Sequence, residues 1–169
     1  SELENMVAEI LETSRMESEH GSLHLVPQDL GQLLGEWVAP YGQVNLSVTE
    51  GTRTKIDSDR LRRVVVNLVE NAVKYSEDGG RVFVTLEKVA GAVRLSVKDS
   101  GPGIPAEELD RVFEPFYRID KSRSSKTGGY GLGLSLCRKI VQAHGGKIWL
   151  ESEAGQGTTA TALLPTVFS

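Results

Sequence analysis

The sequence predicts an α+β fold, a two-layer α/β sandwich in which a mixed sheet carries helices on one face. Two pairs of segments alternate apolar and polar residues around turns that contain glycine, at 81–87 with 92–98 and at 147–152 with 158–164. Other segments have apolar residues at helical spacing. Of the 169 residues, 39% are hydrophobic, which is enough for one compact core.

The first third of the chain is predicted to hold two helices and three short strands. Residues 2–18 share one apolar stripe at helical spacing, and such a stripe needs a partner surface. Asp29 can cap a second helix that runs to about Val38 and ends near Pro40 and Gly42. The expected strands are 23–26, 44–48 and 54–56.

The remaining helices are predicted around a polar loop. Apolar residues lie nearly all round the helix expected at 59–75, so we expect it to be buried. A short helix is expected near 106–112 and a longer one at 132–143. Residues 118–130 hold Lys, Arg, Ser and Gly with little apolar content, which predicts a mobile loop.

Composition excludes several classes of function. The net charge is −4, so nothing favours a surface for duplex nucleic acid, and we expect no nucleic-acid partner. Cys137 is the only cysteine, which rules out an internal disulfide and argues against a cysteine-based zinc site. No apolar run has the length of a membrane span and no signal peptide opens the chain. We therefore expect a cytoplasmic domain cut from a longer parent.

Two asparagines lie four residues apart inside the helix expected at 59–75. Asn67 and Asn71 share a face, and Lys74 continues it one turn further on. Asparagine is a poor residue for a helix interior, and a buried amide without partners is costly. Either both amides bond to neighbouring chain, or they face a polar ligand. An amide oxygen suits Mg²⁺ and an ammonium suits phosphate.

A carboxylate follows the strand expected at 92–98. Period-two alternation places Asp99 on the same inward face as Val93, Leu95 and Val97. A carboxylate that enters a core needs a hydrogen-bond donor. The exocyclic amine of adenine would serve, and so would a backbone amide of the turn at 101–103, which the residues alone favour.

A glycine-rich run at 128–133 opens the helix expected at 132–143. Glycines let backbone N–H groups approach a ligand, and a helix amino terminus favours anions. The run follows a polar loop rather than a strand, unlike a Rossmann fingerprint, and it lacks the Gly-Lys-Ser/Thr ending of a Walker loop. Alone, it is equally the sequence of a flexible hinge.

The order of these features is more specific than any one of them, and it resembles the Bergerat-fold ATPases, the superfamily of gyrase, MutL-type repair proteins and histidine kinases. The resemblance is closest to histidine kinases and covers residues 25–165. Five segments are similar to the N, G1, F and G2 boxes of these kinases and to their closing Gly-x-Gly-Thr turn: 67–75, 99–103, 112–118, 129–134 and 155–158.

The resemblance implies a role for each matching position. Asn71 would ligate Mg²⁺, Lys74 would contact phosphate and Tyr75 would lie beside the nucleotide. Asp99 would accept the adenine amine with support from Thr158. Glycines 129, 131 and 133 would cradle phosphates, and residues 119–130 would form an ATP lid. The implied nucleotide-binding set is Asn67, Asn71, Lys74, Tyr75, Asp99, Gly101, Gly103, Ile104, Arg118, Gly129, Gly131, Leu132, Gly133, Leu134 and Thr158, with Asn71 and Lys74 as its catalytic members.

One position favours phosphoryl transfer over hydrolysis. ATPases such as gyrase carry a glutamate one turn before the metal-binding asparagine, as general base, whereas this chain has Asn67, which cannot accept a proton. Glu70 points about 100° away from Asn71 around the helix. The alternatives are a nucleotide-binding regulatory module without chemistry and a superfamily ATPase.

The resemblance also implies partners. The γ-phosphoryl group of MgATP would pass to a histidine on a dimerisation domain of the same parent, and then to a response regulator. Residues 1–20 would be the end of the second helix of that dimerisation domain, and 21–169 the ATP-binding catalytic domain. The parent would be a homodimer anchored in the bacterial inner membrane.

Overall fold

The computed structural model describes residues 3–4, 7–8, 10–11, 23–76, 80–109, 111–114, 133–153 and 155–166. The described residues between 3 and 11 are helical, as the sequence predicts. The elements after them are β1 (Val26–Asp29), α2 (Leu30–Val38), β2 (Val44–Val48), β3 (Arg53–Ile56), α3 (Ser58–Tyr75), β4 (Val82–Val89), β5 (Ala92–Lys98), the 3-10 helix η1 (Ala106–Glu108), α5 (Gly133–Ala143), β6 (Lys147–Glu153) and β7 (Gly157–Pro165).

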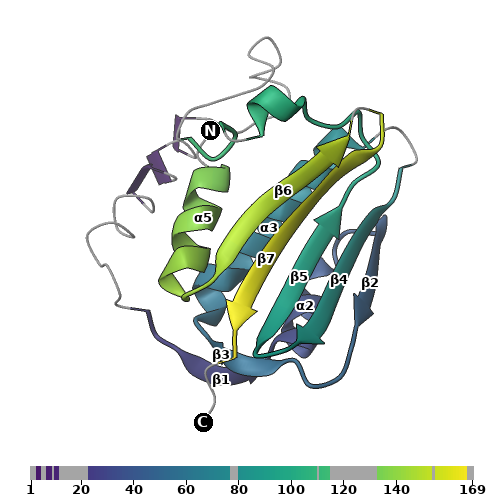
Figure 1. The fold of residues 1–169 in the computed structure, drawn as a ribbon. Coiled ribbons are helices and arrows are strands. Elements are labelled where there is room, and N and C mark those ends of the chain that lie inside the picture. Colours follow the sequence, from purple (N-terminus) through teal and green to yellow (C-terminus); the bar gives the residue numbers. More distant parts are fainter. Residues whose placement is uncertain are drawn as a thin grey trace.

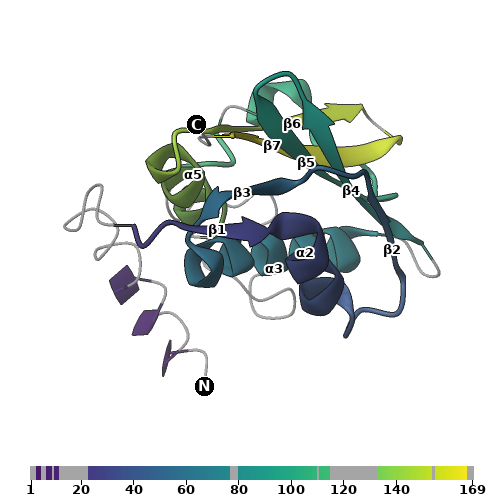
Figure 2. The ribbon, with the colours of Figure 1, turned by 90° about the horizontal axis from the view of Figure 1, so that it is seen from below.

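The main sheet is mixed, which confirms the predicted fold class. Its five strands follow the order β2-β4-β5-β7-β6, and β1 and β3 form a separate two-stranded sheet. Strand β2 runs parallel to β4, whereas every other pair in the main sheet is antiparallel. Helices α2, α3 and α5 lie on one face of this sheet (Figure 1 and Figure 2).

The core lies between the helices and the sheet because alternate residues of each inner strand point toward the helices. Val82, Val84 and Leu86 of β4 are fully buried, and the apolar positions 93, 95 and 97 of β5 continue this layer. Burial of one such side chain stabilises the fold by about 1.5–3 kcal/mol. The core therefore fixes the carboxyl end of β5 against α3, where Asp99 follows.

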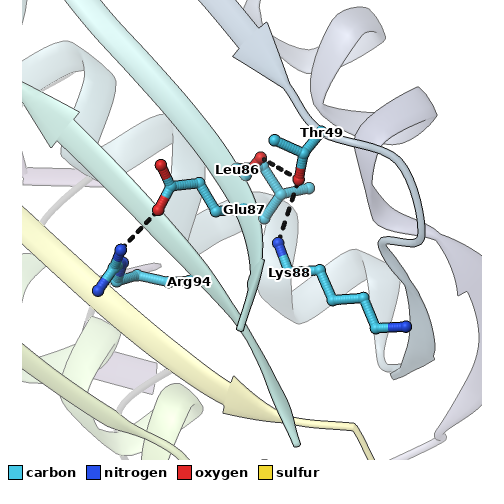
Figure 3. Close-up of polar contacts among 5 residues, drawn as sticks. All are labelled: Thr49, Leu86, Glu87, Lys88 and Arg94. Carbon is cyan, nitrogen blue, oxygen red and sulfur yellow. Dashed lines mark hydrogen bonds and ion pairs between the residues drawn. The ribbon is translucent and has the colours of Figure 1, made fainter. Parts of the chain in front are cut away.

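Polar contacts also join neighbouring strands of the sheet away from the core (Figure 3). Arg94 of β5 pairs with Glu87 of β4 at 2.6 Å, both side chains being substantially exposed. Beside β2, the Thr49 hydroxyl donates to the carbonyl oxygen of Leu86 and accepts from the N–H of Lys88. An exposed pair of this kind is worth about 0–1 kcal/mol, so these contacts define the register more than they stabilise the sheet.

Three sequence predictions differ from the structure. The strand expected at 23–26 lies at Val26–Asp29, because pairing with β3 runs from Val26 opposite Ile56 to Asp29 opposite Arg53. The short helix expected near 106–112 is a single 3-10 turn, held by i to i+3 hydrogen bonds from Glu108 to Pro105 and from Leu109 to Ala106.

The third difference concerns α3, which is not buried all round. Its buried positions form one stripe, while Arg62, Arg63, Glu70 and Lys74 are exposed. The helix packs against both α2 and α5, and its charged side points away from them. Among the described residues, no helix has both the length and the apolar character needed to cross a bilayer.

Candidate functional site

The candidate site lies where α3 ends, β5 ends, β6 turns into β7 and α5 begins. In Figure 1 these ends lie together in the upper part of the molecule. The N–H of Ser100, just after β5, donates to the hydroxyl of Ser76 at the end of α3 (3.3 Å). Glycine at position 101 allows the two segments to approach closely, because a Cβ there would overlap the carbonyl oxygen of Tyr75.

Asp99 is held by two backbone amides. Its Oδ1 accepts from the N–H of Gly101 and from the N–H of Thr158, each at 3.0 Å, and its own N–H donates to the Thr158 carbonyl at 2.9 Å. Burial raises the pKa of the Asp99 carboxyl group, and the two amide hydrogen bonds oppose that shift. Among the described residues, no group donates to Oδ2.

The structure confirms one sequence interpretation of Asp99. The turn amide that the residues favoured does bond to Oδ1, together with Thr158. Oδ2 has no donor within the described residues, and an adenine amine at that oxygen stays a prediction.

The loop from Gly101 to Ile104 is fixed against β6. Gly103 has a φ of +84°, a conformation that favours glycine, and a Cβ there would overlap the carbonyl oxygen of Glu153. The N–H of Ile104 donates to the hydroxyl of Ser152 at 2.6 Å. The backbone of this loop is therefore closely defined on one side of Asp99.

The two asparagines of α3 differ from each other. Asn67 is partly buried, and its carboxamide opposes the effect of burial on the pKa of the Cys137 thiol in α5. That thiol donates to the carbonyl oxygen of Val64 (3.8 Å). The amide oxygen of Asn67 lies 3.8 Å from the position that a Cβ would take on Gly133.

Asn71 is partly buried one turn further along, and no hydrogen bond to its carboxamide occurs within the part of the chain that the structure describes. Lys74 and Tyr75 are exposed beyond it, and Tyr75 retains half of its accessible surface. Asn67 thus lies against α5, whereas the Asn71 carboxamide has no hydrogen-bond partner among the described residues, and a ligand for Asn71 stays a prediction.

Glu70 is turned away from this site. Its Oε1 accepts a hydrogen bond from the phenol of Tyr41, which lies between α2 and β2, at 3.4 Å. Burial raises the pKa of Tyr41, and the Glu70 carboxylate adds to the shift. Glu70 therefore cannot serve as a base beside Asn71.

The start of α5 supplies two residues of the implied set. Gly133 begins the helix, and Leu134 is partly buried against the core. The buried residues Leu136, Ile140 and Val141 fix the helix on the sheet. Burial raises the pKa of Cys137 to about 12, so its thiol stays protonated, as a core residue should. Arg118, Gly129, Gly131, Leu132 and the lid expected at 119–130 lie outside the described residues.

The comparisons identify the family. A sequence profile described as histidine kinase-, DNA gyrase B-, and HSP90-like ATPase matches residues 56–167. The chain is 40% identical to the adaptive-response sensory kinase SasA of Synechococcus elongatus, over 97% of this chain and 44% of SasA. It is 46% identical to the sensor histidine kinase WalK of Bacillus subtilis, over 66% of this chain and 18% of WalK. The chain thus spans less than half the length of these relatives.

Two solved structures share the fold. Full-length ShkA in complex with AMPPNP aligns with a TM-score of 0.84 at 28% identity, covering 99% of this chain and 36% of ShkA. Histidine kinase ThkA in complex with the response regulator protein TrrA aligns with a TM-score of 0.72 at 28% identity, covering 96% of this chain and 49% of that chain.

The matched segment contains α3, the Asp99 loop, α5 and the last hairpin, which are the elements that form the candidate site. Since the family is one of ATPases, ATP is the nucleotide that this domain binds. The chain belongs to the histidine kinase-, DNA gyrase B-, and HSP90-like ATPase family, and within it is similar to the sensor histidine kinases.

Proposed function

We propose that this domain binds MgATP between α3 and the Asp99 loop and transfers the γ-phosphoryl group to a histidine on another domain of its parent. The observation that carries the proposal is the pairing of two polar groups without partners among the described residues, Asp99 Oδ2 and the Asn71 carboxamide. The Asp99 loop meets the end of α3 at Tyr75 and Ser76, one turn beyond Asn71. ATP offers an amine to Asp99 and, with Mg²⁺, its phosphates to Asn71.

The adenine end of the proposal rests on Asp99. Two backbone amides fix Oδ1, so the carboxylate cannot rotate freely and Oδ2 keeps one direction. A hydrogen bond from an amine to a charged acceptor contributes about 1.5–3 kcal/mol. This preorganised acceptor gives the site its preference for a base with an exocyclic amine.

The phosphate end rests on α3. The Asn71 amide oxygen is of the kind that Mg²⁺ accepts as a ligand, and the Lys74 ammonium lies one turn away on an exposed surface. Bound Mg²⁺ would supply neutralisation of phosphate charge. Asn71 would hold the metal, Lys74 would contact a phosphate oxygen, and both would orient the γ-phosphoryl group toward its acceptor.

Two residues of α3 favour transfer over hydrolysis. Asn67 cannot take a proton from water, and the Glu70 carboxylate accepts from Tyr41 instead. With neither residue acting as a base, the domain contributes position and charge, and the acceptor brings its own nucleophile.

The partners are proposed from the helical amino terminus and from the relatives. Leu3, Val7 and Leu11 are largely exposed, as expected for the end of a dimerisation helix at residues 1–20 that precedes a catalytic domain at 21–169. ThkA forms a complex with a response regulator protein, and we propose such a partner here, together with a homodimeric parent. Anchoring of the parent in the bacterial inner membrane, with this domain in the cytoplasm, stays a prediction.

The test is labelled ATP given to the chain together with the dimerisation domain of its parent. We expect label on a histidine of that domain, little released phosphate, and loss of label in Asn71→Ala. Glu70→Gln is the matched control on the same helix and should label normally. Nucleotide binding without any labelled histidine would instead favour a regulatory binding module, and rapid phosphate release abolished by Glu70→Gln would favour an ATPase.

A further inference from the structure

Three polar side chains lie at one level across neighbouring strands, on the face that the helices cover. Ser152 of β6 is paired with Thr158 of β7. Asp99 is bonded to Thr158 by its own N–H, which donates to the Thr158 carbonyl, and by its carboxylate, which accepts from the Thr158 N–H. One level below, the same strands carry apolar residues, with Leu150 opposite Ala160 and Ala160 opposite Val97. The sheet thus changes from apolar to polar where the candidate site begins.

The Ser152 hydroxyl makes three contacts, and their partners fix its proton. Oγ lies 2.6 Å from the N–H of Ile104, 3.0 Å from the carbonyl oxygen of Gly157 and 3.0 Å from Oγ1 of Thr158. A hydroxyl has one proton to donate and two lone pairs to accept with. The carbonyl only accepts, so it receives the proton of Ser152. The amide only donates, so it occupies one lone pair.

The remaining lone pair of Ser152 determines the direction of its contact with Thr158. Since Ser152 has no second proton, Thr158 is the donor and Ser152 the acceptor. The Thr158 hydroxyl therefore donates its only proton to Ser152. Toward a ligand, this hydroxyl can only accept hydrogen bonds.

We propose that Ser152 is a positioning residue that sets the base specificity of the nucleotide site. It holds Thr158 as an acceptor, so the polar groups of Thr158 and Asp99 that remain for a base are all acceptors. Such a site binds a purine that carries an amine at position 6 and rejects one that carries an oxo group there. This inference rests on the proposed nucleotide site and adds the residue that keeps it free of a competing donor.

Removal of the Ser152 hydroxyl has two separable effects. Ile104 and Gly157 lose a hydrogen-bond partner. The loop at 101–104 and the turn before β7 then become less well held, and every nucleotide binds more weakly. The Thr158 proton is also released, so Thr158 can rotate and donate to a 6-oxo group. Only the second effect changes the ratio between two bases, and this ratio separates specificity from support of the fold.

The experiment measures the dissociation constants of ADP and inosine diphosphate, each with Mg²⁺, by calorimetry on the full chain. The two ligands differ at position 6 of the base, which carries an amine in one and an oxo group in the other, and at N1, which accepts in adenine and donates in hypoxanthine. The N1 difference is common to every variant, so the change in the ratio of the two constants between parent chain and variant is the quantity compared. For Ser152→Ala we expect ADP to bind about two- to tenfold more weakly and the preference for ADP to fall about threefold or more. Ser47→Ala, on the exposed edge strand β2, is the matched control and should leave both constants unchanged.

Two further variants make the result decisive. Ser152→Ala with Thr158→Val has no hydroxyl left to donate, so the gain in inosine diphosphate binding should disappear. Ser152→Cys keeps nearly the same volume with a weaker hydrogen-bonding group, and should lower the preference even where Ser152→Ala fails to fold. An unchanged preference in the folded Ser152 variants overturns this inference. A parent chain that binds no adenine nucleotide overturns the proposed function instead.

Discussion

His144 at the end of α5 accepts a hydrogen bond from the backbone N–H of Asp57, through its Nε2 at 3.1 Å. Its Nδ1 lies 2.8 Å from the carbonyl oxygen of Ile140, and because a carbonyl only accepts, the proton is on Nδ1 and the ring is neutral. Asp57 caps α3, and its second carboxylate oxygen accepts from the N–H of His24 at 3.1 Å. His144 therefore links α5 to the start of α3, and Asp57 links α3 to the chain that enters β1.

This link predicts that stability falls in acid. Burial lowers the pKa of His144 below its ordinary value, so the unfolded chain takes up a proton first as the pH drops below about 6.5. The free energy of unfolding should fall from there down to the folded pKa, by at most about 1.4 kcal/mol per pH unit, and should not change above it on this account. Urea unfolding at pH 7.5 and 5.5 measures the loss, and His144→Gln should show a smaller one. Equal losses in both proteins would contradict the assignment.

Asp99→Asn should abolish most nucleotide affinity while leaving the fold intact. The amide oxygen can still accept from Gly101 and Thr158, but the amide nitrogen then replaces Oδ2 and presents a donor to the adenine amine. Loss of a hydrogen bond to a charged group corresponds to about 1.5–3 kcal/mol, or roughly ten- to 150-fold in the dissociation constant of ADP. Calorimetry gives the constant and a thermal melt checks the fold. An unchanged dissociation constant of ADP in this variant would show that Asp99 does not contact the base.

Substitution of Asn67 and of Asn71 by alanine should affect stability differently. Asn71→Ala removes a group without a partner among the described residues, so we expect unchanged stability and a weaker dependence of ADP binding on Mg²⁺. Asn67→Ala removes a partly buried side chain that lies against the start of α5, so it should lower the free energy of unfolding by about 0.5–1.5 kcal/mol as well. Chemical unfolding and calorimetry with and without Mg²⁺ measure both effects. The reverse pattern of stabilities would show that the contact with α5 is not formed.

Gly101→Ala should damage both the fold and the site. The added methyl group overlaps the carbonyl oxygen of Tyr75, so α3 and the Asp99 loop must move apart, at a cost of about 1–3 kcal/mol. Gly35→Ala in α2 is the matched control, since its Cβ meets no atom within 4 Å and alanine favours a helix by about 0.5–1 kcal/mol. Thermal melts should therefore shift in opposite directions. A stable Gly101→Ala protein with full ADP affinity would contradict the close approach.

The sequence allows the prediction of elements whose signals are local. The long helix is expected at 59–75 and lies at 58–75, because the apolar spacing that predicts it is contained in that segment. The position of β1 has no such local signal. It depends on pairing with β3, about 27 residues away, and no local pattern encodes that register.

The candidate site shows the same division. The inward direction of Asp99 follows from alternation along one strand, whereas its second amide donor, Thr158, comes from the far end of the chain. Ser152 was missed although the same alternation, applied to Ile148 and Leu150, directs it inward. The contact of the Cys137 thiol with the Val64 carbonyl was missed because it joins two helices, and a lone cysteine indicates no partner.

The order of the strands in space has a consequence for synthesis of the protein. Strand β7 follows β6 in the sequence but lies in the sheet between β5 and β6, and it carries Thr158. A nascent chain therefore cannot pair β5 with β7, nor hold Asp99 by its second amide, until residues 157–165 have left the ribosome. Truncation before residue 157 would remove an interior strand and one of the two amides that hold the Asp99 carboxylate, so nucleotide binding by this domain requires that β7 has been synthesised.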